Sequence, residues 1–245
     1  MQKIFSIDSR NRVQGTTSNF TVDVQMPFNN NFNRCAILEA EIPKSFYQLD
    51  SSTVNTIEMT EFASGGFTGT ITITPGIFYT TSSLGIELRT QLNGAGGNYN
   101  DYVVEFDSTT GRYTISSPTG PFFLANYGTL VQKYFGFGDG SAQAGGGTYV
   151  SENVVNLQRA DVLYIRTNFA LNNNDNVIAE IYTNNYPNLG VIPFQTQDTR
   201  YSSVTMNNNN TNQFQFSIQD NDGAVIDLNG VDCRFKVVCW ECPCP

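Results

Sequence analysis

Four cysteines near the end of the sequence have the spacing closest to that of a metal site. Cys239 and Cys242 form a Cys-x-x-Cys pair, with Cys233 upstream and Cys244 downstream. Thiolates at this spacing bind zinc in tetrahedral sites. However, Cys233 falls within a predicted strand and Cys244 is the penultimate residue, so the tail would have to fold back to complete a site. We therefore treat these residues as weak metal candidates and expect reduced thiols and no cofactor.

Acid–base chemistry has few candidates in this sequence. None of the 245 residues is a histidine, which removes the usual general base and the most common metal ligand. Glu39 and Glu41 lie two residues apart on a predicted strand and therefore point to one face. Glycosidase carboxylates normally lie on separate elements across a cleft, so a solvated strand face explains this pair better. We expect no catalytic residues and a protein that is not an enzyme.

The stretch IFSIDSRNR, residues 4–12, places Asp8 beside Arg10 and Arg12 where a short apolar run stops. Residues 1–44 carry a net charge of +1, whereas the rest of the chain carries −10. The start of the chain therefore differs electrostatically from the remainder. We predict an N-terminal arm over residues 1–17, which in its simplest interpretation is exposed and held only by local ion pairs.

Alternating apolar and polar residues indicate that strands position these groups. The clearest example is NFTVDVQMPFN, in which Phe20, Val22 and Val24 share one face. The segment RCAILEAEIP follows, with a change of phase near Leu38 that suggests a β-bulge. From Val162 onward the sequence contains only strands and polar turns. Such spacing predicts an all-β fold, a β-sandwich with one or two short helices in its loops.

Two short helices are predicted between these strands. Leu84, Leu88 and Leu92 recur every four residues in TTSSLGIELRTQLN, which is typical of a helix with one buried face. GTLVQKYFGFG predicts a second helix that ends at Gly136. The following GDGSAQAGGG is rich in glycine and small residues and is predicted to be a loop. With no repeat and no clear linker, the sequence predicts one domain over residues 18–245.

The overall charge and hydrophobicity argue against direct nucleic-acid binding and against a membrane-spanning helix. A net charge of −9 and a sequence pI near 4.4 disfavour direct nucleic-acid binding, which needs a surplus of lysine and arginine on one face. No stretch is apolar over the ~20 residues that a membrane-spanning helix needs. The start of the sequence also lacks the apolar region of a signal peptide. We expect synthesis in the host cytoplasm and no membrane span.

The order of several segments resembles that of a known protein family. IDSRNR, NFTVDV, AILEAEIPKSFYQLD, TITPGIFYTTSSLGIEL, VEFDSTTGRYTI and LVQKYFGFG follow one another as in the penton, or minor capsid, proteins of virophages, polinton-like viruses and related large double-stranded DNA viruses. The later ADVLYIRTNF and LNGVDCRFKVVCW are similar to the closing strands of that family. The resemblance covers almost the whole chain.

This resemblance implies a single jelly roll that forms a homopentamer at the five-fold vertices of an icosahedral capsid. It also implies a double-jelly-roll major capsid protein as partner, and localisation in the virion. Asp8, Arg10 and Arg12 would then be assembly contacts, since guanidinium groups bond carboxylates and carbonyls with fixed geometry. Some vertex proteins carry a second domain, for which 245 residues leave little room. The alternative is a carbohydrate-binding β-sandwich, a lectin-like attachment module.

Overall fold

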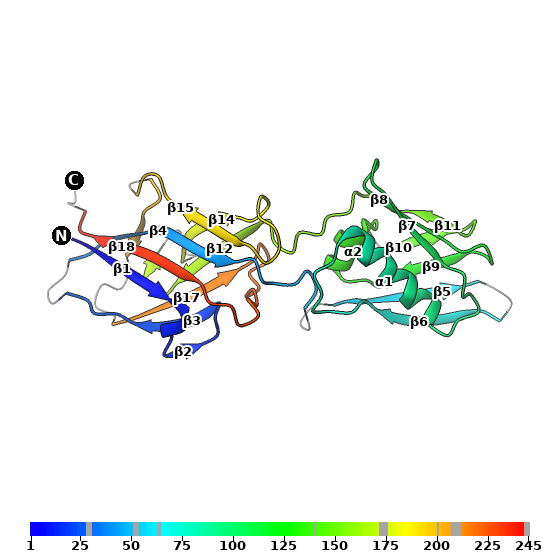
Figure 1. Cartoon of the computed structure of the whole chain (residues 1–245), viewed down its shortest axis with the longest axis horizontal. Coiled ribbons are helices and arrows are strands. Elements are labelled where there is room, and N and C mark those ends of the chain that lie inside the picture. Colours follow the sequence, from blue (N-terminus) through cyan, green and yellow to red (C-terminus); the bar gives the residue numbers. More distant parts are fainter. Residues whose placement is uncertain are drawn as a thin grey trace. The chain divides into compact units, whose positions relative to one another are not determined.

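The computed structural model describes residues 1–27, 31–50, 54–62, 65–139, 141–171, 176–199, 201–206 and 212–242. The chain divides into two compact units (Figure 1). Unit 1 contains Met1–Phe46 and Ala160–Pro245, and unit 2 contains Tyr47–Arg159. Unit 2 is therefore an insertion within the sequence of unit 1. Each unit has a hydrophobic core of its own.

Unit 1 is a sandwich of two antiparallel sheets. The first sheet has the order β1 (Gln2–Asp8), β18 (Arg234–Trp240), β4 (Arg34–Pro43), β16 (Val204–Met206) and β13 (Ala170–Leu171), with β15 (Val191–Gln195) also paired to β4. The second has the order β14 (Val177–Tyr182), β12 (Val162–Thr167), β17 (Gln213–Gln219), β3 (Asn19–Asp23) and β2 (Gln14–Gly15). Along the chain, the long strands β1, β3, β4, β12, β14, β15, β17 and β18 alternate between the two sheets, except that β12 and β14 follow one another in the second sheet. This alternation is that of a jelly roll and confirms the predicted fold class.

The core of unit 1 forms because alternate residues of each strand point inward. In β17, Phe214, Phe216 and Ile218 are buried, while the residues between them face outward. Rings from both sheets meet in this core: Phe216 of β17 lies 5.3 Å from Phe235 of β18, and Phe20 of β3 stacks on both. Such aromatic pairs contribute about 0.5–1.5 kcal/mol beyond the burial of their surface.

The predicted bulge in β4 is confirmed. Ile37 pairs with Val237 and Glu39 with Lys236, so Leu38 has no partner in β18. Its carbonyl oxygen instead accepts a hydrogen bond from the Thr196 backbone N–H. The extra residue shifts the phase of the strand, so that both the N-terminal and the C-terminal halves of β4 direct apolar side chains into the core.

Unit 2 contains two smaller sheets and both helices. One sheet has the order β10 (Ser141–Ala144), β9 (Phe122–Ala125), β5 (Thr56–Glu61) and β6 (Phe67–Thr72), and the other β11 (Thr148–Val150), β8 (Arg112–Ser116) and β7 (Val103–Asp107). Helix α1 (Thr81–Gly94) and helix α2 (Thr129–Phe135) pack with them around a second core. The segment predicted as a loop after α2 therefore includes a strand, β10.

Both predicted helices are confirmed. Leu84, Leu88 and Leu92 of α1 are fully buried. The N-cap of the helix is Thr80: its hydroxyl accepts from the Ser83 N–H, and the Ser83 hydroxyl accepts in return from the Thr80 N–H. This reciprocal capping box satisfies two backbone donors that the helix leaves unpaired. Helix α2 ends at Gly136, whose φ of 66° favours glycine.

The structure corrects both predicted domain boundaries. Residues 1–17 are not a separate arm, because β1 pairs with β18 along its whole length and Phe5 and Ile7 are buried in the core of unit 1. Residues 18–245 are not one domain, because residues 47–159 have their own core. No glycine- or proline-rich linker marks the crossings between the units, which explains why composition did not reveal them.

Candidate functional site

The N-terminal corner of unit 1, where β1 ends, brings together the charged residues singled out in the sequence. Asp8 is the last residue of β1 and caps the 3-10 turn η1 (Ser9–Asn11). Its carboxylate accepts a hydrogen bond of 3.0 Å from the Arg10 backbone N–H. This cap turns the chain away from the sheet and places Arg10 and Arg12 on the surface of the corner.

Asp8 is the centre of an ion-pair network that crosses three strands. Arg10 donates to the Asp8 carboxylate through Nη2 at 2.5 Å and through Nε at 3.0 Å. Arg234 of β18 donates to the same carboxylate at 3.2 Å and lies 3.8 Å from Glu41 of β4. Asp8, Arg234 and Glu41 are register neighbours on adjacent strands. The Arg10 side chain remains 58% exposed.

Arg12 makes a second set of contacts, with the segment that precedes β18. Its Nη1 donates to the Ser9 carbonyl oxygen at 2.8 Å and to the Asp232 carboxylate at 3.2 Å. The Ser9 hydroxyl donates to Asp232 at 2.7 Å and accepts from the Cys233 N–H at 3.1 Å. These bonds fix the corner in one geometry, which leaves less conformational entropy to lose on binding a neighbour.

The charge of Asp8 makes the corner sensitive to acid. Its hydrogen bonds from the Arg10 side chain lower the pKa of Asp8 from 3.8 to about 2. A carboxyl whose pKa falls on folding stabilises the folded state above its unfolded pKa and loses that contribution as pH falls through the folded value. We expect the wild type to lose stability relative to Asp8→Asn between pH 4 and pH 2. Urea unfolding of both proteins at pH 5 and pH 2.5 measures this, and an unchanged difference between them would contradict it.

Glu39 and Glu41 take part in strand-to-strand ion pairs. Lys236 of β18 lies 2.7 Å from Glu39, two register positions from the Arg234–Glu41 pair. Together with Ser6, Asp8 and Asn11, these side chains line a shallow groove on the outer face of the sheet. The basic partners Arg234 and Lys236 were missed in the sequence. Their alternation in RFKVV was the available signal, since it places both on the wet face of a strand.

Cys239 lies opposite Cys35 on the adjacent strand, not beside a second cysteine of the candidate metal set. Cys233 and Cys239 are buried, as is Cys35, whereas Cys242 is exposed and Cys244 lies outside the described residues. Burial raises the pKa of Cys233 and of Cys239 to about 12. Burial and the neighbouring Cys239 also raise that of Cys35. Among the described residues no group of three or more histidine, cysteine, aspartate or glutamate side chains is arranged to hold a metal ion.

Comparisons with known proteins identify the fold. No family model matches the sequence, and no curated protein matches it. Among solved structures, the chain is similar to the crystal structure of a selenomethionine-labelled mavirus penton protein, with a TM-score of 0.56 and 12% sequence identity. The similarity covers 98% of this chain and 99% of that chain, so it extends over both units. The resemblance to a virophage penton protein is therefore confirmed at the level of the fold. Among the described residues, no helix has both the length and the hydropathy needed to cross a membrane.

Proposed function

We propose that the chain is a structural capsid protein that forms a homopentameric penton at the five-fold vertices of an icosahedral double-stranded DNA virus or virophage. The observation that carries this proposal is the similarity to a penton protein over nearly the full length of both chains. Its partners would be four further copies of itself and the major capsid protein of the same virus. The mature location would be the virion.

A structural role also fits the chemistry of the candidate site. The carboxylates of Asp8, Glu39 and Glu41 are each occupied by a basic partner from a neighbouring strand or turn. Because the sequence contains no histidine, carboxylates are the first candidates for an acid–base mechanism. Their engagement in ion pairs favours a scaffold over a hydrolase.

Asp8, Arg10 and Arg12 remain proposed assembly contacts. The Asp8 carboxylate accepts hydrogen bonds from Nε and Nη2 of Arg10. Nη1 of the same exposed guanidinium is then available to donate to a carboxylate or carbonyl of a neighbouring subunit. Asp8 thereby orients the group that would make the contact.

The oligomeric state tests the proposed function. We expect mass photometry of the purified protein, over a range of concentrations, to show a species of about five times the 27.1 kDa chain mass. The purified protein lacks the capsid contacts that can add to pentamer stability. Its pentamer fraction should therefore depend on mass action and rise with protein concentration. A chain that stays monomeric at the highest concentration and binds glycans tightly on an array would instead favour the lectin-like module.

A further inference from the structure

The jelly roll of unit 1 has two open lateral edges on opposite sides. One is the β14–β15 edge, formed by the terminal strand β14 of one sheet, by β15 of the other and by the loops before and after β15. The second is the β1 edge, formed by the terminal strand β1 together with β3 and η1. Figure 1 shows β14 and β15 along the upper side of unit 1 and β3 and β2 along its lower side.

The β14–β15 edge collects large exposed apolar side chains. Tyr182 is 67% exposed, Leu189 74%, Val191 55% and Tyr201 90%. A groove of about 590 Å³ runs between β14 and the end of β15, lined on one side by Glu180. Within the described part of the chain Glu180 makes no ion pair. Tyrosine and apolar side chains around a polar group are typical of protein interfaces.

The β1 edge offers complementary groups. Strand β1 is extended over seven residues and, among the described residues, pairs with β18 alone, so its outer side presents a free strand edge there. Ile4 is 52% exposed and Val13 is 54% exposed. The cations here are Lys3, held over the Phe5 ring at 5.0 Å, and Arg10. A groove of about 290 Å³ separates β1 from β3. The acids Asp8 and Asp23 also line this groove, and Asp8 is paired with Arg10. Lys3 makes no ion pair within the described part of the chain, so it is the cation that can face Glu180.

We propose that the β14–β15 edge of one subunit packs against the β1 edge of the next copy of this chain, with Glu180 facing Lys3. This inference rests on the proposed function and names the two halves of its subunit contact. A closed ring of identical subunits requires a heterologous interface, made by two different surfaces of the same chain. Two open edges on opposite sides of one sandwich meet that requirement. In such a contact the β14–β15 edge of one copy would cover the outer side of β1 in the next copy, and the β1 edge would cover the exposed apolar side chains of the β14–β15 edge.

A charge placed among the apolar side chains of the β14–β15 edge tests whether that edge lies in the subunit contact. We expect Tyr182→Glu to weaken association at least about tenfold in mass photometry, because it buries a carboxylate near Glu180. Ile86→Glu is the matched control, since Ile86 is 63% exposed but lies on α1 in unit 2. Both variants should keep the wild-type melting temperature. Equal association by the two variants would overturn the inference.

A charge exchange tests the pairing itself. Glu180→Lys and Lys3→Glu should each weaken the pentamer, and the double variant should recover at least part of the loss, because opposite charges would again face each other in every interface. Lys3 also donates to the Gln25 carbonyl oxygen, so the melting temperature of each variant is measured as well. If Lys3→Glu unfolds β1, the association of Glu180→Lys and Tyr182→Glu alone tests the proposed contact. A wild-type pentamer that none of these changes weakens would overturn this inference and leave the proposed function standing; a wild type that never assembles would overturn both.

Discussion

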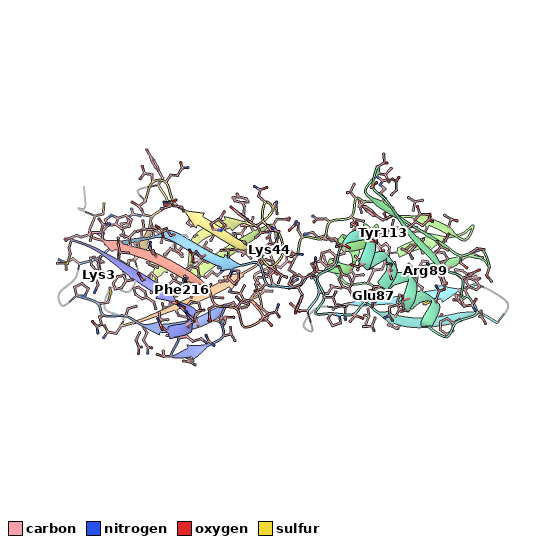
Figure 2. All side chains as sticks on the ribbon, viewed as in Figure 1. Lys3, Lys44, Glu87, Arg89, Tyr113 and Phe216 are labelled. Atoms are coloured by element: carbon pink, nitrogen blue, oxygen red, sulfur yellow. The ribbon has the colours of Figure 1, made fainter. Side chains whose placement is uncertain are left out.

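Replacing Phe216 by alanine is expected to lower the free energy of unfolding of unit 1 by about 3 to 5 kcal/mol. Phe216, labelled in Figure 2, is fully buried, and its ring centroid lies 5.6 Å from that of Phe20, 5.3 Å from Phe235 and 5.8 Å from Phe169. Phe20 and Phe235 come from opposite sheets, so these rings cannot close the cavity without moving the sheets together. The loss therefore includes the cavity as well as the burial of the ring.

Tryptophan fluorescence makes this measurement specific to unit 1. The chain has a single tryptophan, Trp240, which lies at the end of β18. Urea unfolding followed by Trp240 should show the lower stability of Phe216→Ala. Gln215→Ala is the matched control, because Gln215 is the preceding residue of the same strand and is exposed; it should change the free energy by less than about 0.5 kcal/mol. A loss below about 1 kcal/mol for Phe216→Ala would contradict the described core.

Replacing Glu61 by alanine is expected to lower the free energy of unfolding of unit 2 by about 2 to 4 kcal/mol. Glu61 is only 1% exposed, and its carboxylate accepts from the backbone N–H groups of Asn98 and Tyr99 and from the Tyr102 hydroxyl. The N–H distances are 2.5 and 3.1 Å. A Cβ at Gly97 would lie 2.6 Å from both carboxylate oxygens, so glycine is needed for this approach. Alanine at position 61 would leave the three donors without their acceptor.

Amide hydrogen exchange locates this effect. We expect the N–H groups of Asn98 and Tyr99 to exchange faster in Glu61→Ala, and Glu61→Gln to show a smaller change because it keeps one acceptor oxygen. Glu58→Ala is the matched control on the same strand, since Glu58 accepts only an exposed hydrogen bond from Asn126. It should cost less than about 1 kcal/mol. Unchanged exchange at both amides in Glu61→Ala would refute the role assigned to the carboxylate.

Local patterns predicted the elements well because each pattern reports burial on one face. The leucines of α1, the phenylalanines of β17 and the change of phase at Leu38 all correspond to side chains that the structure buries or shifts. Strand β10 escaped prediction because Ser141–Ala144 pairs through its backbone with β9, and a ladder of backbone hydrogen bonds needs no apolar side chain.

The division into two units escaped prediction for a different reason. At the first crossing, Lys44 looks like a surface residue, yet it is buried and donates to the carbonyl oxygens of Thr183 at 3.1 Å and Tyr186 at 2.7 Å. These partners lie 139 and 142 residues further along the chain, so no local sequence pattern predicts that Lys44 is buried. The same applies to the candidate site, where Asp8 and Arg10 are neighbours in sequence but Arg234 joins them only through strand register.

The pairing of β1 with β18 has a consequence for the order of events during translation. Gln2 pairs with Trp240, so the first sheet of unit 1 can be completed only after residue 240 has left the ribosome. Unit 2 is continuous in sequence from Tyr47 to Arg159, so all its residues emerge before β17 and β18. Until then, β1, β3 and β4 lack their partners β17 and β18, although every residue of unit 2 has already been synthesised. Their apolar faces and strand edges stay exposed during that interval, which makes this part of the nascent chain prone to aggregation.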